Sequence, residues 1–381
     1  ISKVHNSKKK FNQKDLQTLV FGTSIIIVSV FFLYLFRFIQ KLIISRVFGP
    51  EGFGIFSIGE MVLNLATLFS LLGLQTGIKK FISHYRSLKE NNSIKGIIFG
   101  SLKIILPLSI LISLLILFFV PFISRNIFHD ENLISSLYIF AMIIPFNALS
   151  FIISSVFMGM KRPKYDAITT TFGRNFFSLL FAGIAVYFGF EINVIFWTYF
   201  FSFIISNTLG VYLLKKKIFP LLKTGFSTKY HYSKLLHYSL PLFFSTFFTV
   251  VLGWTDTFFL GSLRNLIDVG VYNAVLSLSL VFSVFSTSLK RMFLPILGGL
   301  FAKKEFGNIG ELYVTSARWI YLFSLPFLLI IFFYSQNILN LVYGSSYILG
   351  ASSLLILMIS SFFQSFIGPT NVLITIFEKT K

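Results

Sequence analysis

The chain has 381 residues and a mass of 43.5 kDa, which is long enough for two or three soluble domains. Its composition excludes that organisation, because 55% of the residues are hydrophobic, 12% are charged and the mean hydropathy is +0.82, whereas soluble proteins carry roughly 25% charged residues. The net charge of +20 does not indicate nucleic-acid binding either, since the basic residues lie between long apolar runs, as in a protein surrounded by lipid.

Ten apolar segments follow one another along the chain, each bounded by Gly, Pro, Asn or charged residues. Each is long enough to cross the hydrocarbon layer as a helix, which takes about 20 residues. Their hydrophobicity is continuous rather than alternating, which excludes the strands of a membrane β-barrel. The predicted spans are residues 16–44, 53–78, 96–120, 133–159, 167–189, 192–214, 237–260, 270–296, 310–333 and 347–377.

Basic residues are distributed unevenly between the loops. With the N-terminus placed inside, the inner loops and the two chain ends hold 25 Lys and Arg, and the outer loops hold 3. The positive-inside rule therefore predicts a cytoplasmic N-terminus in the plasma (inner) membrane. The outer loops are short and leave no room for the external domain that a polytopic glycosyl polymerase or ligase needs, which makes that alternative the weaker one.

A sequence pattern repeats across the polar segment 215–236, which separates six spans from four. Gly54, after the first span, falls opposite Gly270, after the seventh, and Lys103 in the third span falls opposite Arg318 in the ninth. The first and seventh spans both run outward, so the repeat is parallel. We expect a basic cytoplasmic tail (1–15), an N-lobe of six helices (16–214), a cytoplasmic linker (215–236) and a C-lobe of four helices that is incomplete (237–381).

Several short motifs occur in a fixed order along the chain. They are Arg46-Val-Phe-Gly-Pro-Glu-Gly-Phe-Gly54, Gly73-Leu-Gln-Thr-Gly77, Gly159-Met-Lys-Arg-Pro163, Ser239-Leu-Pro-Leu242 and Gly270-Val-Tyr-Asn273. With these motifs the chain resembles the polysaccharide flippases (Wzx-like carriers) of the multidrug/oligosaccharidyl-lipid/polysaccharide (MOP) exporter superfamily. The resemblance implies a MATE/MOP-like bundle of two helical lobes around a central cavity. It also implies alternating access that carries an isoprenoid-pyrophosphate-linked oligosaccharide from the inner to the outer leaflet.

Charged side chains inside the spans indicate where a site lies, because a charge at mid-membrane costs at least ~2.5 kcal/mol and usually faces a polar cavity. Lys103, Arg174 and Arg318 either snorkel to the inner head groups or line a basic vestibule that attracts an anionic pyrophosphate. The matched placement of Lys103 and Arg318 favours the vestibule. Four further candidates lie at inner helix ends, where the positive-inside rule alone also predicts cations: Lys79, Lys80, Lys290 and Arg291.

A second group of embedded charges lies nearer the outer face. Arg37 and Lys41 are in the outer part of the first span, Glu60 is at a similar depth in the second, and Asp256 is near the outer end of the seventh. We expect Arg37 or Lys41 to pair with Glu60 in the same lobe, or with Asp256 across the lobes, as an outer gate. The alternative is that the cations anchor at the outer interface and the aspartate caps a bend.

Motifs for chemistry are missing from the sequence. It contains no Walker loop, Ser-His-Asp arrangement or paired carboxylates, no Cys, and five His without metal-ligand spacing. We therefore expect a monomeric transporter without a cofactor or metal, whose partners are a lipid-linked oligosaccharide, membrane lipids and a coupling ion, H⁺ or Na⁺. A MATE-type drug or organic-cation antiporter is the alternative, but it would need acidic residues where the first span is basic.

Overall fold

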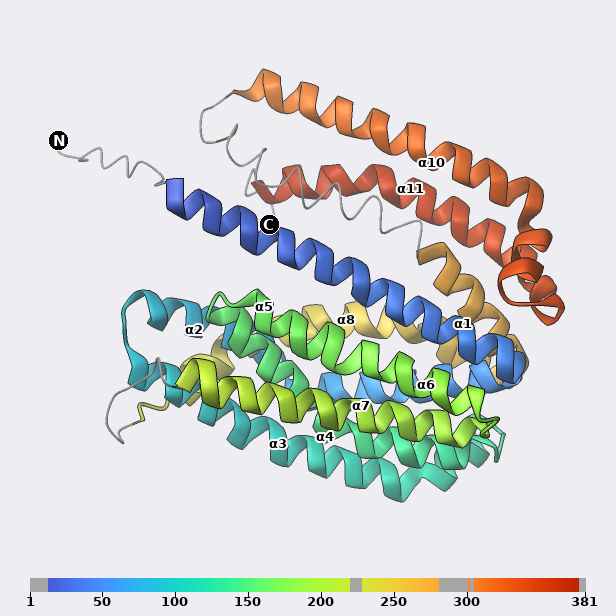
Figure 1. Cartoon of the computed structure of the whole chain (residues 1–381), viewed down its shortest axis with the longest axis horizontal. Helices are drawn as coiled ribbons and strands as arrows, with labels where there is room; N and C mark the ends of the chain where they lie inside the picture. The colour runs from blue at the N-terminus through green and yellow to red at the C-terminus, as the bar shows by residue number, and fades with distance from the viewer. Residues whose placement is uncertain (1–12, 220–227, 281–300, 302–304, 377–381) are drawn as a thin grey trace.

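The computed structural model describes residues 13–219, 228–280, 301 and 305–376. Every regular element in this part of the chain is a helix, and the helices run roughly along one long axis (Figure 1). Seven of the described helices are long and apolar enough to cross a membrane, and a shorter apolar helix covers Leu266–Leu280. This confirms the predicted all-helical membrane class. Residues 1–12, and with them most of the expected basic tail, lie outside the described residues.

The first two predicted spans are the limbs of one element, α1 (Gln13–Leu71), which reverses at Gly49–Pro50. Gly49 has φ 68° and ψ −172°, in the region that favours glycine, and Pro50 cannot continue a helix through its missing N–H. Residues 13–48 form the outgoing limb and residues 50–71 the returning limb. Because the limbs are antiparallel, side chains equally far from the reversal can meet.

The remaining N-terminal helices pack around the returning limb. Helix α4 is the most buried span, with 67% of its apolar window inside the protein. In the N-terminal half of α4, Phe140 packs edge-on against Phe56 of α1, with ring centroids 5.7 Å apart. The elements in this part are α2 (Leu74–Ser87), α3 (Asn91–Phe122), η1 (Ile123–Ile127), α4 (Leu133–Gly159), α5 (Pro163–Asp166), η2 (Ala167–Phe176), α6 (Phe177–Tyr187), α7 (Ile192–Leu213) and η3 (Leu214–Ile218).

The fifth predicted span is continuous but not a regular α-helix, because its middle part, η2, is a π-helix. Three consecutive threonines lie in it, and Thr169 and Thr170 donate hydroxyl hydrogen bonds to the carbonyl of Asp166 at 3.0 and 2.7 Å. Such side-chain bonds compete with the regular backbone pattern. The wider turn changes the direction in which the following residues Arg174 and Asn175 point, and π segments are frequent at functional sites.

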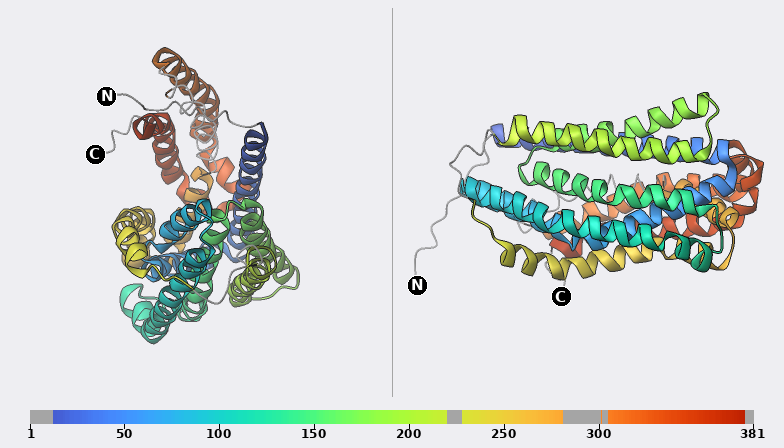
Figure 2. Two further views of the ribbon diagram at one scale, coloured as in Figure 1. Left: turned by 90° about the vertical axis from the view of Figure 1, so that its left-hand side faces the viewer. Right: turned by 90° about the horizontal axis from the view of Figure 1, so that it is seen from below.

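The C-terminal helices are α8 (Tyr232–Leu263), the helix Leu266–Leu280, α10 (Phe306–Val342), η5 (Ser345–Gly350) and α11 (Ala351–Ile376). Helix α8 packs on the N-terminal helices, while α10 and α11 lie together on the other side of the outgoing limb of α1 (Figures 1 and 2). The α8 contact is close, because a Cβ at Gly73 would lie 2.5 Å from the carbonyl oxygen of Ser239. Helical structure at Leu214–Ile218 and from Tyr232 onward extends into the expected linker 215–236.

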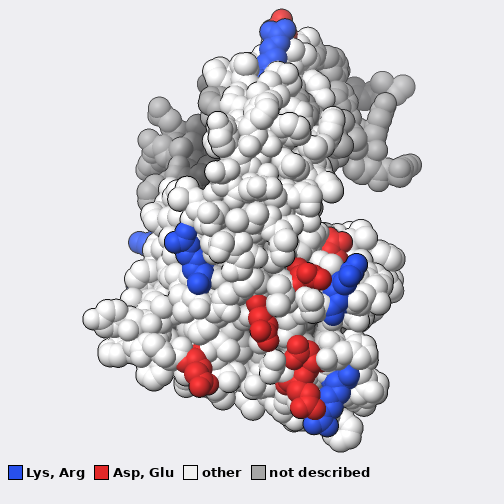
Figure 3. Space-filling model, turned by 90° about the vertical axis from the view of Figure 1, so that its right-hand side faces the viewer, with Lys and Arg blue, Asp and Glu red and all other residues white. Residues whose placement is uncertain are grey.

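The two ends of the bundle differ in charge. One end, here called the acidic end, is seen in Figure 3. Its turns hold Glu51, Asp130, Glu131, Glu191 and Asp268 together with Arg46, Arg125 and Arg264. The opposite end, here called the basic end, holds the lysine-rich turns within residues 79–95, 161–164, 215–219 and 228–234. A transmembrane orientation with the basic end inside would satisfy the positive-inside rule.

Candidate functional site

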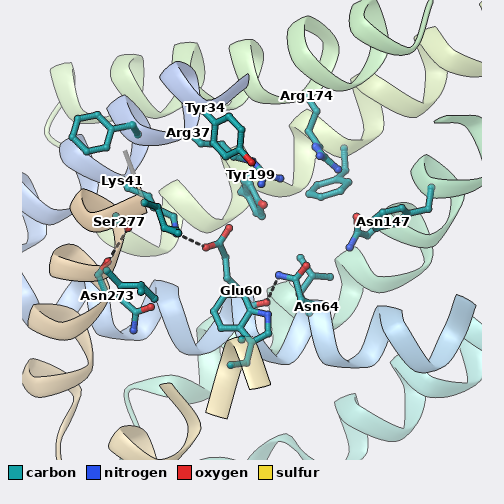
Figure 4. A pocket seen from close by; sticks show the side chains of 18 residues that line it. Tyr34, Arg37, Lys41, Glu60, Asn64, Asn147, Arg174, Tyr199, Asn273 and Ser277 are labelled. Atoms are coloured by element: carbon teal, nitrogen blue, oxygen red, sulfur yellow. Dashed lines mark hydrogen bonds and ion pairs between the residues drawn. The ribbon is translucent and has the colours of Figure 1, made fainter. Parts of the chain in front are cut away.

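A cavity of about 390 Å³ lies between the N-terminal helices and the pair formed by α8 and the helix Leu266–Leu280. It is deep in the bundle, since Arg37 is 12 residues, or about 18 Å, from the reversal at Gly49. Figure 4 shows polar side chains from several helices pointing into it. The polar and charged residues of its wall are Tyr34, Arg37, Lys41, Glu60, Asn64, Asn147, Arg174, Tyr199, Trp254, Asn273 and Ser277.

The hairpin of α1 brings two of these charges together. Nζ of Lys41, on the outgoing limb, lies 3.1 Å from Oε2 of Glu60, on the returning limb, and the side chains are 25% and 13% exposed. One turn further along, the amide of Asn64 donates a hydrogen bond of 2.7 Å to the backbone carbonyl of Glu60. The carboxylate of Glu60 therefore neutralises Lys41. The other two cations, Arg37 and Arg174, have no further acid in the described part of the cavity wall.

Arg37 is held at the cavity by a polar seam between α1 and the fifth span. Its Nε donates a hydrogen bond of 3.1 Å to Oδ1 of Asn175 in η2. One turn along, Nε2 of Gln40 donates a 2.7 Å bond to the buried hydroxyl of Ser178. Both bonds cross between helices that are apolar on their lipid-facing sides, so they fix the rotation of the outgoing limb and the direction of the Arg37 side chain.

Arg174 has a less complete set of partners. Its guanidinium carbon lies 5.1 Å from the centroid of the Phe203 ring, a cation–π arrangement. Its Nε is buried and has no hydrogen-bond partner among the residues that the structure describes. A buried charged donor without an acceptor is costly. An anionic oxygen in the cavity would supply the missing acceptor.

The wall contributed by the C-terminal helices is neutral in the described part of the chain. It consists of Gly253 and Trp254 from α8 and of Asn273, Leu276, Ser277 and Leu280 from the next helix. Nδ2 of Asn273 is engaged with the carbonyl of Val269 at 3.0 Å, so this residue is already oriented without a ligand. The described part of the wall thus holds three cations and one acid, all from the N-terminal helices.

The structure does not bring all the residues expected for a basic vestibule together. Arg174 lines the cavity, but Lys103 and Arg318 are exposed and absent from its wall. Nζ of Lys103 instead lies 4.9 Å from the ring centroid of Tyr230, near the basic end, which corresponds to the snorkelling interpretation. Lys79 and Lys80 are exposed on α2, away from the cavity, and Lys290 and Arg291 lie outside the described residues.

The expected gate residues are likewise divided. Lys41 and Glu60 form a pair, whereas Arg37 is bonded to Asn175. Asp256 is not in the cavity wall and accepts a 2.6 Å hydrogen bond from the hydroxyl of Tyr272 on the neighbouring helix. An ion pair between Asp256 and Arg37 or Lys41 is therefore not present in the described residues, because the aspartate faces another helix.

The contacts that close the acidic end involve residues that the sequence analysis did not assign to a gate. Nε of Arg46 donates a 2.7 Å hydrogen bond to the carbonyl of Val342, and its Nη2 donates to the carbonyl of Leu341, at the C-terminus of α10. The hydroxyl of Tyr347 donates a buried 2.9 Å bond to the carbonyl of Ser45. These bonds join the outgoing limb of α1 to the α10–α11 pair above the cavity.

Two glycines complete this closure. A Cβ on Gly54 would overlap the carbonyl oxygen of Leu266, and a Cβ on Gly270 would overlap that of Pro50. The returning limb of α1 and the helix Leu266–Leu280 therefore cross in backbone contact. Gly54 and Gly270 were matched by the internal repeat, and paired positions of a repeat can meet in this way only near its pseudo-symmetry axis.

A membrane-spanning helical bundle with a polar cavity between its halves, closed at one end by contacts between them, is the architecture of a secondary transporter. Residues 19–301, more than half of the chain, match the family model described as polysaccharide biosynthesis protein, and residues 241–381 match the model described as MatE. The chain belongs to the polysaccharide biosynthesis protein family of the MOP superfamily. It is a transporter rather than an enzyme, as the sequence analysis predicted.

Comparisons with individual proteins agree with this assignment. Stage V sporulation protein B of Bacillus subtilis is 27% identical over 145 residues, which are 38% of this chain and 28% of that protein, so the match spans less than a third of the relative. An inward-facing MATE family multidrug resistance transporter of the MOP superfamily superimposes with a TM-score of 0.66 at 15% identity, over 90% of this chain and 83% of that one.

Two further solved structures share the fold. The MATE multidrug transporter DinF-BH, solved as a ligand complex, has a TM-score of 0.66 at 13% identity, over 99% of this chain and 86% of that one. A MOP superfamily transporter from Pyrococcus furiosus, described as having a binding pocket of reverse polarity, has a TM-score of 0.57 at 13% identity, over 94% and 84% of the two chains. At these identities the likenesses show the fold alone, and confirm the predicted MATE/MOP-like class.

Proposed function

We propose that this protein is a flippase that moves isoprenoid-pyrophosphate-linked oligosaccharide units from the inner to the outer leaflet of the cell membrane by alternating access. The observation that carries the proposal is the charge of the central cavity. Among the described residues of its wall, the cations Arg37, Lys41 and Arg174 face a single acid, Glu60. A cavity with net positive charge at low dielectric attracts an anionic group and repels an organic cation. The match to the polysaccharide biosynthesis family supports the same cargo class.

Arg174 and Arg37 are suited to bind the pyrophosphate. The unpartnered Nε of Arg174 is a donor in need of an acceptor, and Arg37 retains its terminal guanidinium nitrogens after Nε has bonded to Asn175. Arginine matches phosphate oxygens through paired N–H groups. The neutral wall opposite, with Trp254, Asn273 and Ser277, offers a ring face and amide and hydroxyl groups of the kind that contact sugars.

The pair of Lys41 and Glu60 is proposed to respond to the cargo. In the structure, Oε2 of Glu60 lies 3.1 Å from Nζ of Lys41. A pyrophosphate carries more negative charge than one carboxylate and competes with it for the lysine. Release of Glu60 would free a carboxylate that can take up H⁺ or Na⁺, and we propose this residue as the site of the coupling ion.

From the closed acidic end we infer that cargo reaches the cavity from the basic end, on a side other than the contact between α2 and α8. In the described residues, the hydrogen bonds that join α1 to α10 and η5 all lie at the acidic end. With the basic end inside and the N-terminus cytoplasmic, as the lysine distribution favours, this state would load cargo from the inner leaflet. Breaking of the Arg46 and Tyr347 contacts would then release it outward.

A MATE-type antiporter for organic cations is the second candidate, and the MatE match over residues 241–381 favours it. The matched part, however, contributes only neutral residues to the described cavity wall. A cationic drug would have to bind against three cations, with Glu60 already engaged.

Purified protein in proteoliposomes tests the two functions side by side. A fluorescent isoprenoid-pyrophosphate oligosaccharide is placed in one leaflet, and its appearance in the other is followed by an impermeant quencher; a fluorescent organic cation is assayed in parallel. We expect translocation of the anionic lipid, with loss in the double variant Arg37→Ala/Arg174→Ala. Translocation of the cation alone would overturn the proposal.

A further inference from the structure

A second hollow lies at the basic end, on the outer surface of the junction between α2 and α8. It is an open groove of about 530 Å³ and shares no lining residue with the central cavity. Its wall consists of Phe81, Ser233, Lys234, His237, Tyr238, Pro241 and Leu242. The groove is therefore a feature separate from the proposed transport site.

The groove lies beside the contact between α2 and α8, which are packed closely at Gly73 and Gly77. A Cβ at Gly77 would meet Leu235 at 3.0 Å, so the two helices are in close contact there. One turn further along α2, Phe81 meets Tyr238 edge-on with ring centroids 5.6 Å apart and forms the floor. Beyond this contact, Pro241 and Leu242 continue the floor as an apolar track along α8.

Basic side chains surround one end of the groove. Nζ of Lys80 lies 3.6 Å from the ring centroid of Tyr238, which holds the ammonium group at the rim. Lys234 and His237 line the groove from the first turns of α8 and are exposed. No Asp or Glu is among the lining residues in the described part of the chain. The basic end of the groove can therefore bind an anion, and its apolar end can bind a hydrocarbon chain.

The depth of the groove matches a lipid of the same leaflet. The lining residues of α8 run from Ser233 to Leu242, and nine residues of helix rise by about 14 Å. That length covers the head-group layer and the upper part of the acyl chains. The basic residues lie at the start of α8, and the apolar residues lie further along the helix. A phospholipid has its phosphate and its acyl chains in the same order.

We propose that this groove binds an anionic phospholipid of the leaflet at the basic end, with its phosphate among Lys80, Lys234 and His237 and an acyl chain along Pro241 and Leu242. The groove joins α2 of the N-terminal helices to α8 of the C-terminal helices, so the bound lipid bridges the two halves. It stabilises the arrangement in which α2 and α8 are in contact at this end.

The experiment uses the full chain in nanodiscs of phosphatidylcholine with or without phosphatidylglycerol, and needs no transport cargo. Native mass spectrometry counts the lipids that stay bound after mild detergent release. We expect retention of phosphatidylglycerol over phosphatidylcholine. The double variant Lys80→Ala/Lys234→Ala should weaken that retention by about fivefold for each cation removed.

Matched variants distinguish this site from general surface charge and from misfolding. Lys164→Ala/Lys215→Ala removes the same charge from exposed lysines elsewhere at the basic end and should leave retention unchanged. Lys80→Arg/Lys234→Arg keeps the charges and should retain the lipid. Three results would each overturn the site. They are an equal loss of phosphatidylglycerol in both alanine variants, unchanged retention of it in Lys80→Ala/Lys234→Ala, and retention of phosphatidylcholine equal to that of phosphatidylglycerol. Because no cargo is present, none of these results depends on the proposed transport activity.

Discussion

Arg46 and Val342 are 296 residues apart in the sequence, yet the guanidinium Nε of Arg46 donates a 2.7 Å hydrogen bond to the carbonyl oxygen of Val342. This bond and the one to Leu341 satisfy carbonyl groups that the C-terminus of α10 leaves without helical partners. The contact therefore joins the two halves at the closed acidic end.

Replacement of Arg46 by Ala should therefore favour opening at the acidic end. Loss of two charge-assisted bonds in an exposed position amounts to about 1–2 kcal/mol, or about tenfold in the open-to-closed ratio. The chain contains no cysteine, so a single Ser277→Cys introduced in the cavity wall reports accessibility. Its labelling by an impermeant maleimide added at the acidic end should become about tenfold faster.

Arg125→Ala is the control for that experiment. Arg125 is also at the acidic end but pairs with Glu131 of the same turn at 2.9 Å. Arg125→Ala removes the same charge as Arg46→Ala but breaks no contact between the two halves. The rate of labelling at position 277 should therefore not change. Equal acceleration in both variants would show that charge at the surface, not the Arg46 contact, controls access.

Alanine at Gly54 or Gly270 should loosen the helix crossing that these residues form. A methyl group at either position overlaps a backbone oxygen, which cannot move as a flexible side chain can. Overpacking of this kind costs about 1–3 kcal/mol, so thermal unfolding in detergent should shift downward. Gly183→Ala is the control. A Cβ at Gly183 would have no atom of a neighbouring described element within 4 Å, so this variant should unfold at or slightly above the wild-type temperature.

The Lys41–Glu60 pair can be measured with a double-mutant cycle. Removing either partner leaves a charge in a site where the side chains are 25% and 13% exposed. We expect each of Lys41→Met and Glu60→Gln to lower the free energy of unfolding by about 1–3 kcal/mol, less than for a fully buried pair. The double variant should recover about 1 kcal/mol or more of the summed loss. Additive losses would show that the pair contributes no coupling energy.

Arg174 and Arg318 give a matched test of the anionic cargo. Both are arginines within spans, but only Arg174 lines the cavity and keeps a buried donor without an acceptor. Arg174→Ala should raise the concentration of pyrophosphate-linked lipid needed for half-maximal transport by about tenfold or more, since hydrogen bonds to charged groups contribute about 1.5–3 kcal/mol. Arg318→Ala should leave it near the wild-type value. The reverse order would contradict the placement of the cargo.

Most of the fold could be predicted from the sequence, because membrane spans depend on length and continuous hydrophobicity. The reversal of α1 was also visible, since Gly49–Pro50 separates two apolar runs. The prediction that the second span continues to residue 78 was wrong, because Gly73 takes φ 73° and begins the separate helix α2. A glycine inside an apolar run gives no sign of which φ it adopts.

The cavity was harder to predict. The depth of a residue can be counted along its helix, but the direction in which its side chain points cannot be read from the sequence. Lys103 and Arg174 lie at similar depths from the basic end, and only the second faces the cavity. The π-helix adds to the difficulty, since counting at 100° per residue fails within η2. The predicted spans put Arg46 in an outer loop, but side-chain types do not predict its partner carbonyls on α10.

The separation of the cavity wall into a charged side and a neutral side has a consequence for how such carriers can diversify. In the proposed function, one half of the molecule binds the phosphate and the other half contacts the variable part of the cargo. Substitutions at Trp254, Asn273 or Ser277 can then alter selectivity while the residues that bind the phosphate stay unchanged. Exchanging the segment 232–280 between related carriers would then transfer preference without rebuilding the machinery that holds the anion.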